Sequence, residues 1–146
     1  MQNTTHRINF EDQQARIALL AKTAVEGYHA LWEQMVAQWR AAETDAAWLT
    51  YCANYLFHTA GVHWALDPLS LFSRLSLPNN LDFANDLAPL EAVVLTHRHA
   101  DHLDLELLSE LVDLPVTRIV PDFLLEELLP VFNGRAARII VPHPGV

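Results

Sequence analysis

The sequence predicts an α/β fold with a mixed, partly parallel sheet. From Glu91 onward, apolar runs alternate with helix-like segments, in the order "AVVLT", "DLELLSELVDL", "VTRIVP", "FLLEELLPVF", "ARIIVP". Strands that are separated by helices favour parallel pairing. Upstream, residues 48–66 are rich in aromatic and β-branched residues, which favours antiparallel strands. The chain of 146 residues has the length of one ordinary domain and can bury a core.

The N-terminal segment is expected to be one long helix from Asn9 to Trp39. Asn9 can cap it, and the first turn is acidic, as the helix dipole prefers. This helix is predicted to pack its apolar stripe on a core, with a dimerising helix as the alternative. We therefore divide the chain into an N-terminal helical extension, residues 1–45, and a second region, residues 46–146. Helical spacing connects the apolar positions Ile17, Leu20, Ala24, Tyr28, Leu31, Met35 and Trp39.

The stretch after Ala47 is predicted to form a β-hairpin. Its strands are expected near 48–58 and 62–66, with "TAG" as the turn and Asp67-Pro68 closing the second strand. His58 and His63 flank the turn, and isolated histidines on a strand are expected to be structural. A connecting segment with a short helix and a turn at 78–80 should follow.

Composition excludes several classes of function. The chain carries 18 acidic against 9 basic residues, a formal net charge of -9. Nucleic-acid binders need the opposite charge, so a small-molecule substrate is expected and nucleic acid is not. No apolar run approaches the roughly 20 residues that span a bilayer, so no membrane partner is expected. The absence of a signal peptide and the single cysteine, Cys52, predict a reducing, cytoplasmic location.

The stretch "LTHRHADHLD", residues 95–104, gathers imidazoles and carboxylates directly after an expected buried strand. Ligands of open α/β sheets bind at this end of the strands. Neutral imidazole and carboxylate are donors that Zn²⁺, Mn²⁺ and Fe²⁺ accept. A polar surface loop is the alternative, but four donors at this spacing favour a site for one or two metal ions. Those four are His97, His99, Asp101 and His102, while Asp104 is expected to cap the next helix.

These residues resemble a known family. "THRHADHLD" is similar to the His-x-His-x-Asp-His signature of metallo-β-lactamase-fold hydrolases, and "GVHWALDP" resembles that family's earlier strand ending in aspartate. The resemblance covers roughly residues 48–146 and is closest to the branch with lactonase-like and phosphodiesterase-like members. It implies an αββα sandwich of two similar halves. It also implies hydrolysis of a small ester, lactone or phosphoester by a metal-activated water.

The resemblance assigns roles by position. His97 and His99 would bind a first ion, and Asp101 with His102 a second. Asp101 would also orient the attacking water, as the catalytic carboxylate. Asp67 would be an outer acceptor that fixes a histidine ring, with a plain strand-end turn as the alternative. Zinc is the expected metal, as one or two ions, and manganese or iron suit the same donors.

The sequence departs from this family beyond residue 127. Further ligands, including a bridging aspartate, usually come from the second half, yet no Asp or Glu follows Glu127. His143 is the remaining histidine there, expected as a turn residue or as a ligand. The chain is therefore expected to be an N-terminal half with little turnover alone. Its open apolar sheet face should be buried against another copy or a complementing C-terminal half. The alternative is a non-catalytic metal-binding or assembly module that retains half a site.

Overall fold

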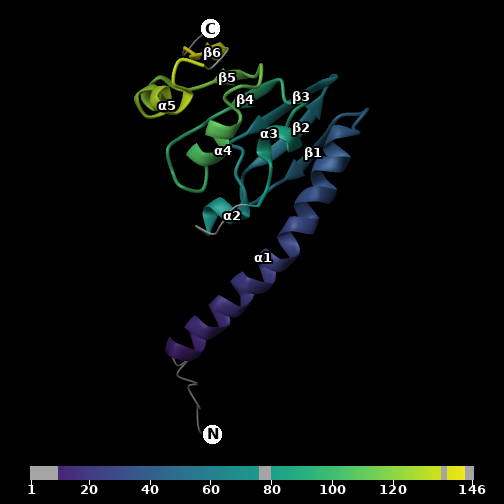
Figure 1. Ribbon diagram of the computed structural model, residues 1–146, viewed down its shortest axis with the longest axis vertical. Helices are drawn as coiled ribbons and strands as arrows, with labels where there is room; N and C mark the ends of the chain where they lie inside the picture. Colours follow the sequence, from purple (N-terminus) through teal and green to yellow (C-terminus); the bar gives the residue numbers. More distant parts are fainter. Residues whose placement is uncertain (1–9, 76–79, 136–137, 144–146) are drawn as a thin grey trace, which may run out of the picture.

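The structure is a computed structural model that describes residues 10–75, 80–135 and 138–143, apart from some side chains near the start of the first helix (Figure 1). Helices and strands alternate after the first hairpin, as predicted. The elements are α1 (Phe10–Arg40), β1 (Ala46–Leu49), β2 (Tyr55–Thr59), β3 (Val62–Leu66), α2 (Leu71–Arg74), α3 (Phe83–Asp86), β4 (Ala92–Val94), α4 (Leu105–Glu110), β5 (Thr117–Ile119), the 3₁₀ helix η1 (Asp122–Leu124), α5 (Leu125–Phe132) and β6 (Arg138–Ile140).

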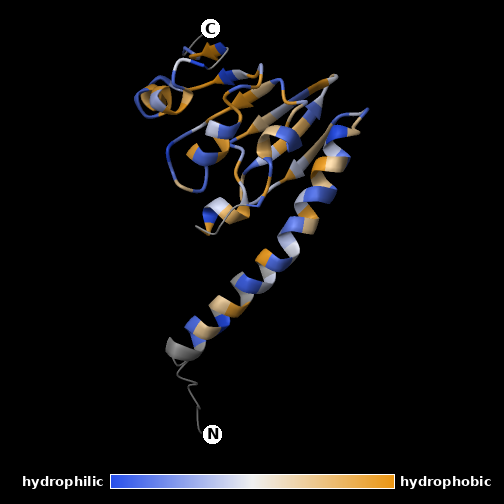
Figure 2. Ribbon diagram, in the orientation of Figure 1, coloured by the Kyte–Doolittle hydropathy of each residue, from blue (hydrophilic) through white to orange (hydrophobic). Residues whose placement is uncertain are grey.

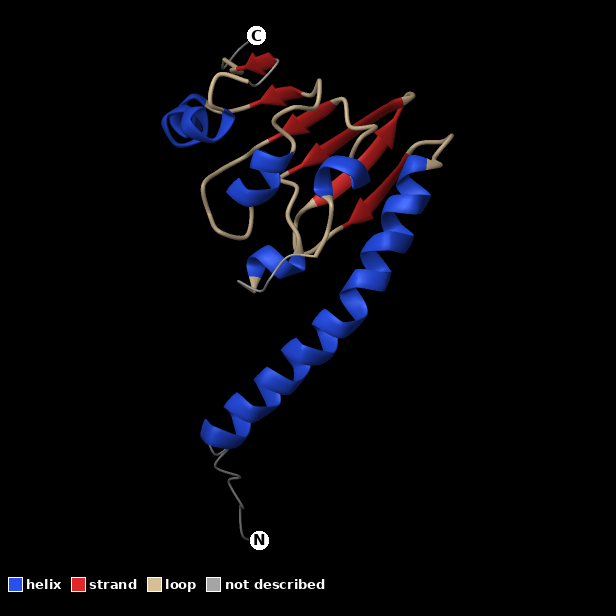
Figure 3. Cartoon of the chain, in the orientation of Figure 1, coloured by secondary structure: helices blue, strands red, loops and turns tan. Residues whose placement is uncertain are grey.

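The described strands form one mixed sheet in the order β1-β2-β3-β4-β5-β6 (Figure 3). Strands β1 to β3 pair antiparallel, and β3 to β6 pair parallel. The predicted α/β class with a partly parallel sheet is confirmed. The single long strand expected near 48–58 is wrong, because a turn at 50–54 divides it into β1 and β2. The amide of Thr50 donates to the carbonyl of Asn54 at 2.8 Å and closes that turn.

The hairpin between β2 and β3 turns where it was expected. Ala60 has φ 51° and Gly61 φ 83°, so both central residues are left-handed, as type I′ hairpins require. This turn fixes the register in which His58 faces His63. The two histidines have structural partners: His58 Nδ1 lies 2.9 Å from the Thr44 carbonyl, and His63 Nε2 lies 3.0 Å from the carbonyl of Trp39.

The C-terminal half of α1 packs on the sheet, as the predicted apolar stripe requires. Its buried residues are Tyr28, Trp32, Met35, Val36 and Trp39. Leu31 is 56% exposed, so its place in the predicted stripe is wrong. The side chains of Ile17, Leu20 and Ala24, like Asn9, lie outside the described part. Figure 1 shows the N-terminal half of α1 extending beyond the sheet. No helix among the described residues is long and apolar enough to cross a membrane.

The core lies between the helices and one face of the sheet. That face presents, in register across the strands, the side chains of Trp48, Leu56, Ala65, Val93, Arg118 and Ile139. The Arg118 guanidinium is 1% exposed and donates to the carbonyls of Leu111 and Val116. Burial lowers the pKa of Arg118, and its guanidinium also lies 5.2 Å from the ring centre of Phe132. These contacts attach α4 and α5 to β5.

The opposite face of the sheet is apolar as well. Alternation along the strands places two cross-strand rows on it. Side chains there are half-buried or exposed, Leu49 to 51% and Ile140 to 38%. Figure 2 shows that hydrophobic residues occur along the strands as well as on the helices. The described residues place no helix on this face, and its burial against a partner stays a prediction. The rows are Leu49, Tyr55, Leu66, Val94, Ile119, Ile140 and Ala47, Phe57, Trp64, Ala92, Thr117, Arg138.

Candidate metal centre

The histidine-rich loop meets the end of a neighbouring strand. Strands β3 and β4 are parallel neighbours, so their carboxyl ends share one edge of the sheet. Asp67 follows β3 directly, and its amide donates to the Val94 carbonyl at 2.8 Å. Its φ of 42° turns the chain away from the sheet at that point. The Asp67 carboxylate, 1% exposed, therefore lies beside the residues that follow β4.

The Asp67 carboxylate accepts hydrogen bonds on both oxygens. Its Oδ1 accepts from the backbone amide of Thr96 at 2.7 Å. Its Oδ2 accepts from the Thr96 hydroxyl and lies 2.8 Å from Nδ1 of His102. A buried carboxylate needs such partners, because an unpaired charge there is costly. The expected contact between Asp67 and a histidine ring is thus present.

These contacts define where the protons lie when both imidazoles are neutral. An ionised carboxylate only accepts, so the Thr96 hydroxyl donates to Asp67, and His102 carries its proton on Nδ1. The Thr96 oxygen lies 2.8 Å from Nδ1 of His97. Because that hydroxyl has donated its own proton, it accepts from Nδ1 of His97. Both imidazoles then keep the lone pair of Nε2, the form in which histidine binds a metal.

Three donors come together in this centre. One ligand atom each from Asp67, His97 and His102 lie within 4.8 Å of one another, so this cluster can hold a metal ion. The rings of His97 and His102 are 4.0 Å apart between centroids. Two donors on one tetrahedral zinc ion lie about 3.3 Å apart, so small side-chain rotations bring such atoms onto one ion. Nitrogen and carboxylate oxygen suit zinc, manganese and iron alike.

His99 and Asp101 lie beside this cluster and outside the group of mutually close donors. The His99 ring is 4.6 Å from that of His97, between centroids. Asp101 Oδ2 is 3.9 Å from Nε2 of His102, and its side chain is 42% exposed. The carbonyl of His99 accepts from the amides of His102 and Leu103, at 2.8 and 3.0 Å, which tightens the loop. Their expected roles as ligands stay predictions.

Two residues in the centre were not expected from the sequence. Asn54 is fully buried, and its Nδ2 donates to the carbonyls of Asp67 at 2.8 Å and Asp101 at 2.9 Å. It therefore connects the end of β3 to the histidine loop. It precedes Asp101 by 47 residues, so no local pattern indicates the contact. Thr96 precedes His97, but a threonine at the end of a strand is common and carries no signal by itself.

Asp104 ends the loop as the predicted helix cap. Its Oδ1 accepts from the amide of Leu107 at 3.0 Å at the start of α4. Its Oδ2 is buried and has no partner among the described residues. Burial, with a smaller contribution from the nearby Asp104 carboxylate, raises the pKa of Tyr28 to about 12. The Tyr28 hydroxyl donates to the Thr50 carbonyl at 3.0 Å, which connects α1 to the turn that holds Asn54.

His143 lies outside the centre. It is exposed and follows β6, which is separated from β4 by β5. Two strand spacings amount to roughly 10 Å. The structure therefore does not bring His143 into the cluster.

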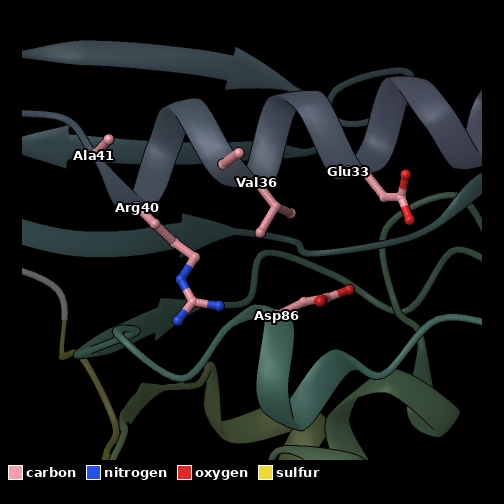
Figure 4. A pocket seen from close by; sticks show the side chains of 6 residues that line it. Glu33, Val36, Arg40, Ala41 and Asp86 are labelled. Carbon is pink, nitrogen blue, oxygen red and sulfur yellow. The ribbon is translucent and has the colours of Figure 1, made fainter.

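A groove lies between α1 and α3, away from the histidine loop (Figure 4). Its volume is about 460 Å³, and Val36 with two alanines forms its apolar wall. Its polar groups already have partners. Arg40 donates to the carbonyl of Asn85 at 3.2 Å, and the carboxylate of Asp86 accepts from the Trp32 indole at 2.8 Å. This groove is part of the helix packing.

Comparison with known proteins adds no relative. No protein-family model matches the chain, and a search of curated proteins finds no similar sequence. The resemblance to metallo-β-lactamase-fold hydrolases therefore rests on the signature residues alone. The geometry of Asp67, His97 and His102 is independent of that resemblance.

Proposed function

We propose that this chain belongs to a metal-dependent hydrolase with a metallo-β-lactamase-like αββα fold. Its substrate would be a small ester, lactone or phosphoester. The observation that supports this most is the hydrogen bond between Asp67 and His102, extended through Thr96 to His97. These hydrogen bonds orient the two imidazoles and leave their Nε2 atoms free to bind a metal at the carboxyl ends of β3 and β4.

The proposed ligands are those that the resemblance to metallo-β-lactamase-fold hydrolases assigns by position. His97 with His99 would hold one ion, and His102 with Asp101 a second. A bound dication supplies an activated water, because it lowers the pKa of that water to around 7 in favourable sites. Asp67 belongs to the group of mutually close donors, but both of its oxygens already take part in hydrogen bonds, so it would fix the His102 ring from outside the ion. Asp101, half-exposed beside Nε2 of His102, would orient that water.

Substrate class follows from charge and access. His99 is exposed, so the centre opens to solvent on the side where a small molecule would enter. Arg98 is exposed between the two histidines, and its guanidinium donates to the carbonyl of Phe123 at 3.3 Å. That contact directs Arg98 towards η1, so the proposed ester, lactone or phosphoester rests on the family resemblance and not on this cation. The net charge of -9 disfavours a polyanionic macromolecule.

The second candidate is a non-catalytic metal-binding or assembly module. The observation that favours it is the exposure of His99 and Asp101, which lie outside the group of mutually close donors. Catalysis needs ligands held by supporting contacts, and weak metal binding does not. In this case the chain would bind metal without turnover.

Metal analysis tests both candidates. The metal content of the purified protein is compared with that of His97→Ala and His102→Ala. His29→Ala, at a half-buried position of α1 paired with Glu33, is the matched control. Loss of metal in the two loop variants alone is the expected result, and equal content in all four proteins would refute the centre. Chelator-sensitive hydrolysis of phosphodiester and lactone substrates then separates the enzyme from the binding module.

A further inference from the structure

The Tyr28 hydroxyl on α1 lies where three segments of the candidate metal centre meet. It donates to the carbonyl of Thr50 at 3.0 Å, in the turn before β2. The backbone amide of Leu71, after β3, and the carboxylate of Asp104, after β4, both act on the pKa of this phenol, so they lie close to it. The side chain of Tyr28 is buried. One phenol of the N-terminal helix thus lies beside the turn before β2 and the segments that follow β3 and β4.

We propose that Tyr28 positions the histidine loop, residues 95–104, for metal binding through the turn that holds Asn54. This role rests on the proposed function, since it presupposes that the loop binds a metal ion. It extends the metal centre to α1, a helix to which the resemblance to known hydrolases assigns no role. None of the contacts described for Tyr28 reaches a proposed ligand, so the residue acts through its neighbours.

The connection from Tyr28 to the loop is a series of hydrogen bonds. The amide and the hydroxyl of Thr50 both donate to the carbonyl of Asn54, at 2.8 and 3.1 Å. The Asn54 side chain donates in turn to the carbonyls of Asp67 and Asp101. Thr50 and Asn54 are both buried, so water competes little for these groups. A shift of the Thr50 carbonyl is therefore passed on to the loop through Asn54.

The ring of Tyr28 is held independently of its hydroxyl. It meets the ring of Phe72 in α2 edge to face, with the centroids 5.5 Å apart at 78°. The ring of Trp32, one turn further along α1, lies 6.2 Å away between centroids. A phenylalanine at position 28 keeps both of these ring contacts. The hydroxyl can therefore be removed without emptying its place in the core.

Removal of the hydroxyl tests the proposed role. Tyr28→Phe leaves the carbonyl of Thr50 without its donor. Zinc affinity, measured against a competing chelator, should fall about 3–10-fold, less than the 10–100-fold typical of residues that touch a ligand. In the metal-free protein, the amides of His102 and Leu103 should exchange about 2–10-fold faster, the range that the net contribution of one hydrogen bond gives. Unchanged zinc affinity in Tyr28→Phe overturns the proposal and leaves the proposed function standing.

A variant in the last turn of α1 separates positioning from general stability. Trp39→Phe removes the indole that donates to the carbonyl of Phe57 at 2.9 Å, and it leaves a smaller ring in the core. Its thermal unfolding midpoint should fall at least as far as that of Tyr28→Phe. Its zinc affinity and the exchange of its loop amides should equal those of the wild type. If both variants lose zinc affinity equally, Tyr28 only stabilises the fold and the proposal is overturned.

The double variant of Tyr28→Phe and Asn54→Ala tests the route. Because Tyr28 acts through Asn54, the double variant should lose less zinc affinity than the product of the two single losses. Single losses that multiply in full overturn the proposal. A wild type that binds no zinc refutes the proposed function instead. Amide exchange in the metal-free protein then decides, since equal exchange in Tyr28→Phe and the wild type shows that Tyr28 does not order the loop.

Discussion

The ring of His102 is held by the carboxylate of Asp67, 35 residues earlier in the chain, at 2.8 Å. The carboxylate is buried at the end of β3, whereas the imidazole lies on the loop after β4. Their contact exists because these two strands are parallel neighbours. This contact therefore orients the His102 ring of the candidate metal centre without the help of a metal ion.

Replacing Asp67 should weaken both the fold and the metal centre. Asp67→Asn keeps the shape but presents a donor to Thr96 and His102, which both need an acceptor. Leaving these donors unpaired against the buried side chain of residue 67 should cost about 1–3 kcal/mol, measurable by urea unfolding of the metal-free protein. Zinc affinity, measured against a competing chelator, should fall about 10–100-fold. Asp113→Asn, in the exposed pair with Arg135, is the control and should change neither quantity.

Removing the Thr96 hydroxyl should free the His97 ring. In Thr96→Val, Nδ1 of His97 loses its acceptor, so the proton moves between both nitrogens. Nitrogen NMR of the metal-free protein should show a mixture of tautomers for His97, and zinc affinity should fall about tenfold. Thr96→Ser retains the hydroxyl and should behave as the wild type. A tautomer that does not change in Thr96→Val would contradict the proton arrangement.

Truncating Asn54 should loosen the histidine loop. Asn54→Ala leaves the carbonyls of Asp67 and Asp101 without their donor. The variant also removes the acceptor of the Cys52 amide, so three hydrogen bonds are lost in a buried place. The free energy of unfolding should fall by about 2–3 kcal/mol. Hydrogen exchange of the amides at His102 and Leu103 should become faster. Exposed Asn80 provides the control, as Asn80→Ala should stay within about 0.5 kcal/mol of the wild type.

Tyr28 should make the protein sensitive to alkaline pH. Burial raises the pKa of Tyr28 from 10.0 to about 12 in the folded state. Because the unfolded chain loses this proton first, the stabilising effect is complete below pH 10 and is lost as the pH rises towards 12. The loss should be on the order of 2–3 kcal/mol, visible in urea unfolding at stepped pH. Tyr28→Phe should flatten this dependence, whereas Tyr51→Phe should retain it.

The sequence predicted the architecture because its patterns are local. Alternating strands and helices after Glu91 gave the mixed sheet, and Asp104 was identified as a helix cap. The prediction was wrong for Leu31 of α1, because tertiary packing decides which of two similarly spaced helix faces is buried. Leu31 and Trp32 both fit a helical period, and Trp32 is buried because its indole finds the carboxylate of Asp86 and its ring meets Phe83.

The candidate metal centre, too, could be predicted from the sequence only in part. The histidine loop is recognisable in one short stretch, because metal donors at close spacing are rare by chance. Of its partners, Asp67 was expected only through the family resemblance, and Asn54 was not expected at all. Both come from other elements and reach the loop only when β3 pairs with β4. The sequence by itself determined which donors exist and that they follow a buried strand. The tertiary structure alone decided which of them meet, because contacts between distant residues depend on strand order and not on spacing along the chain.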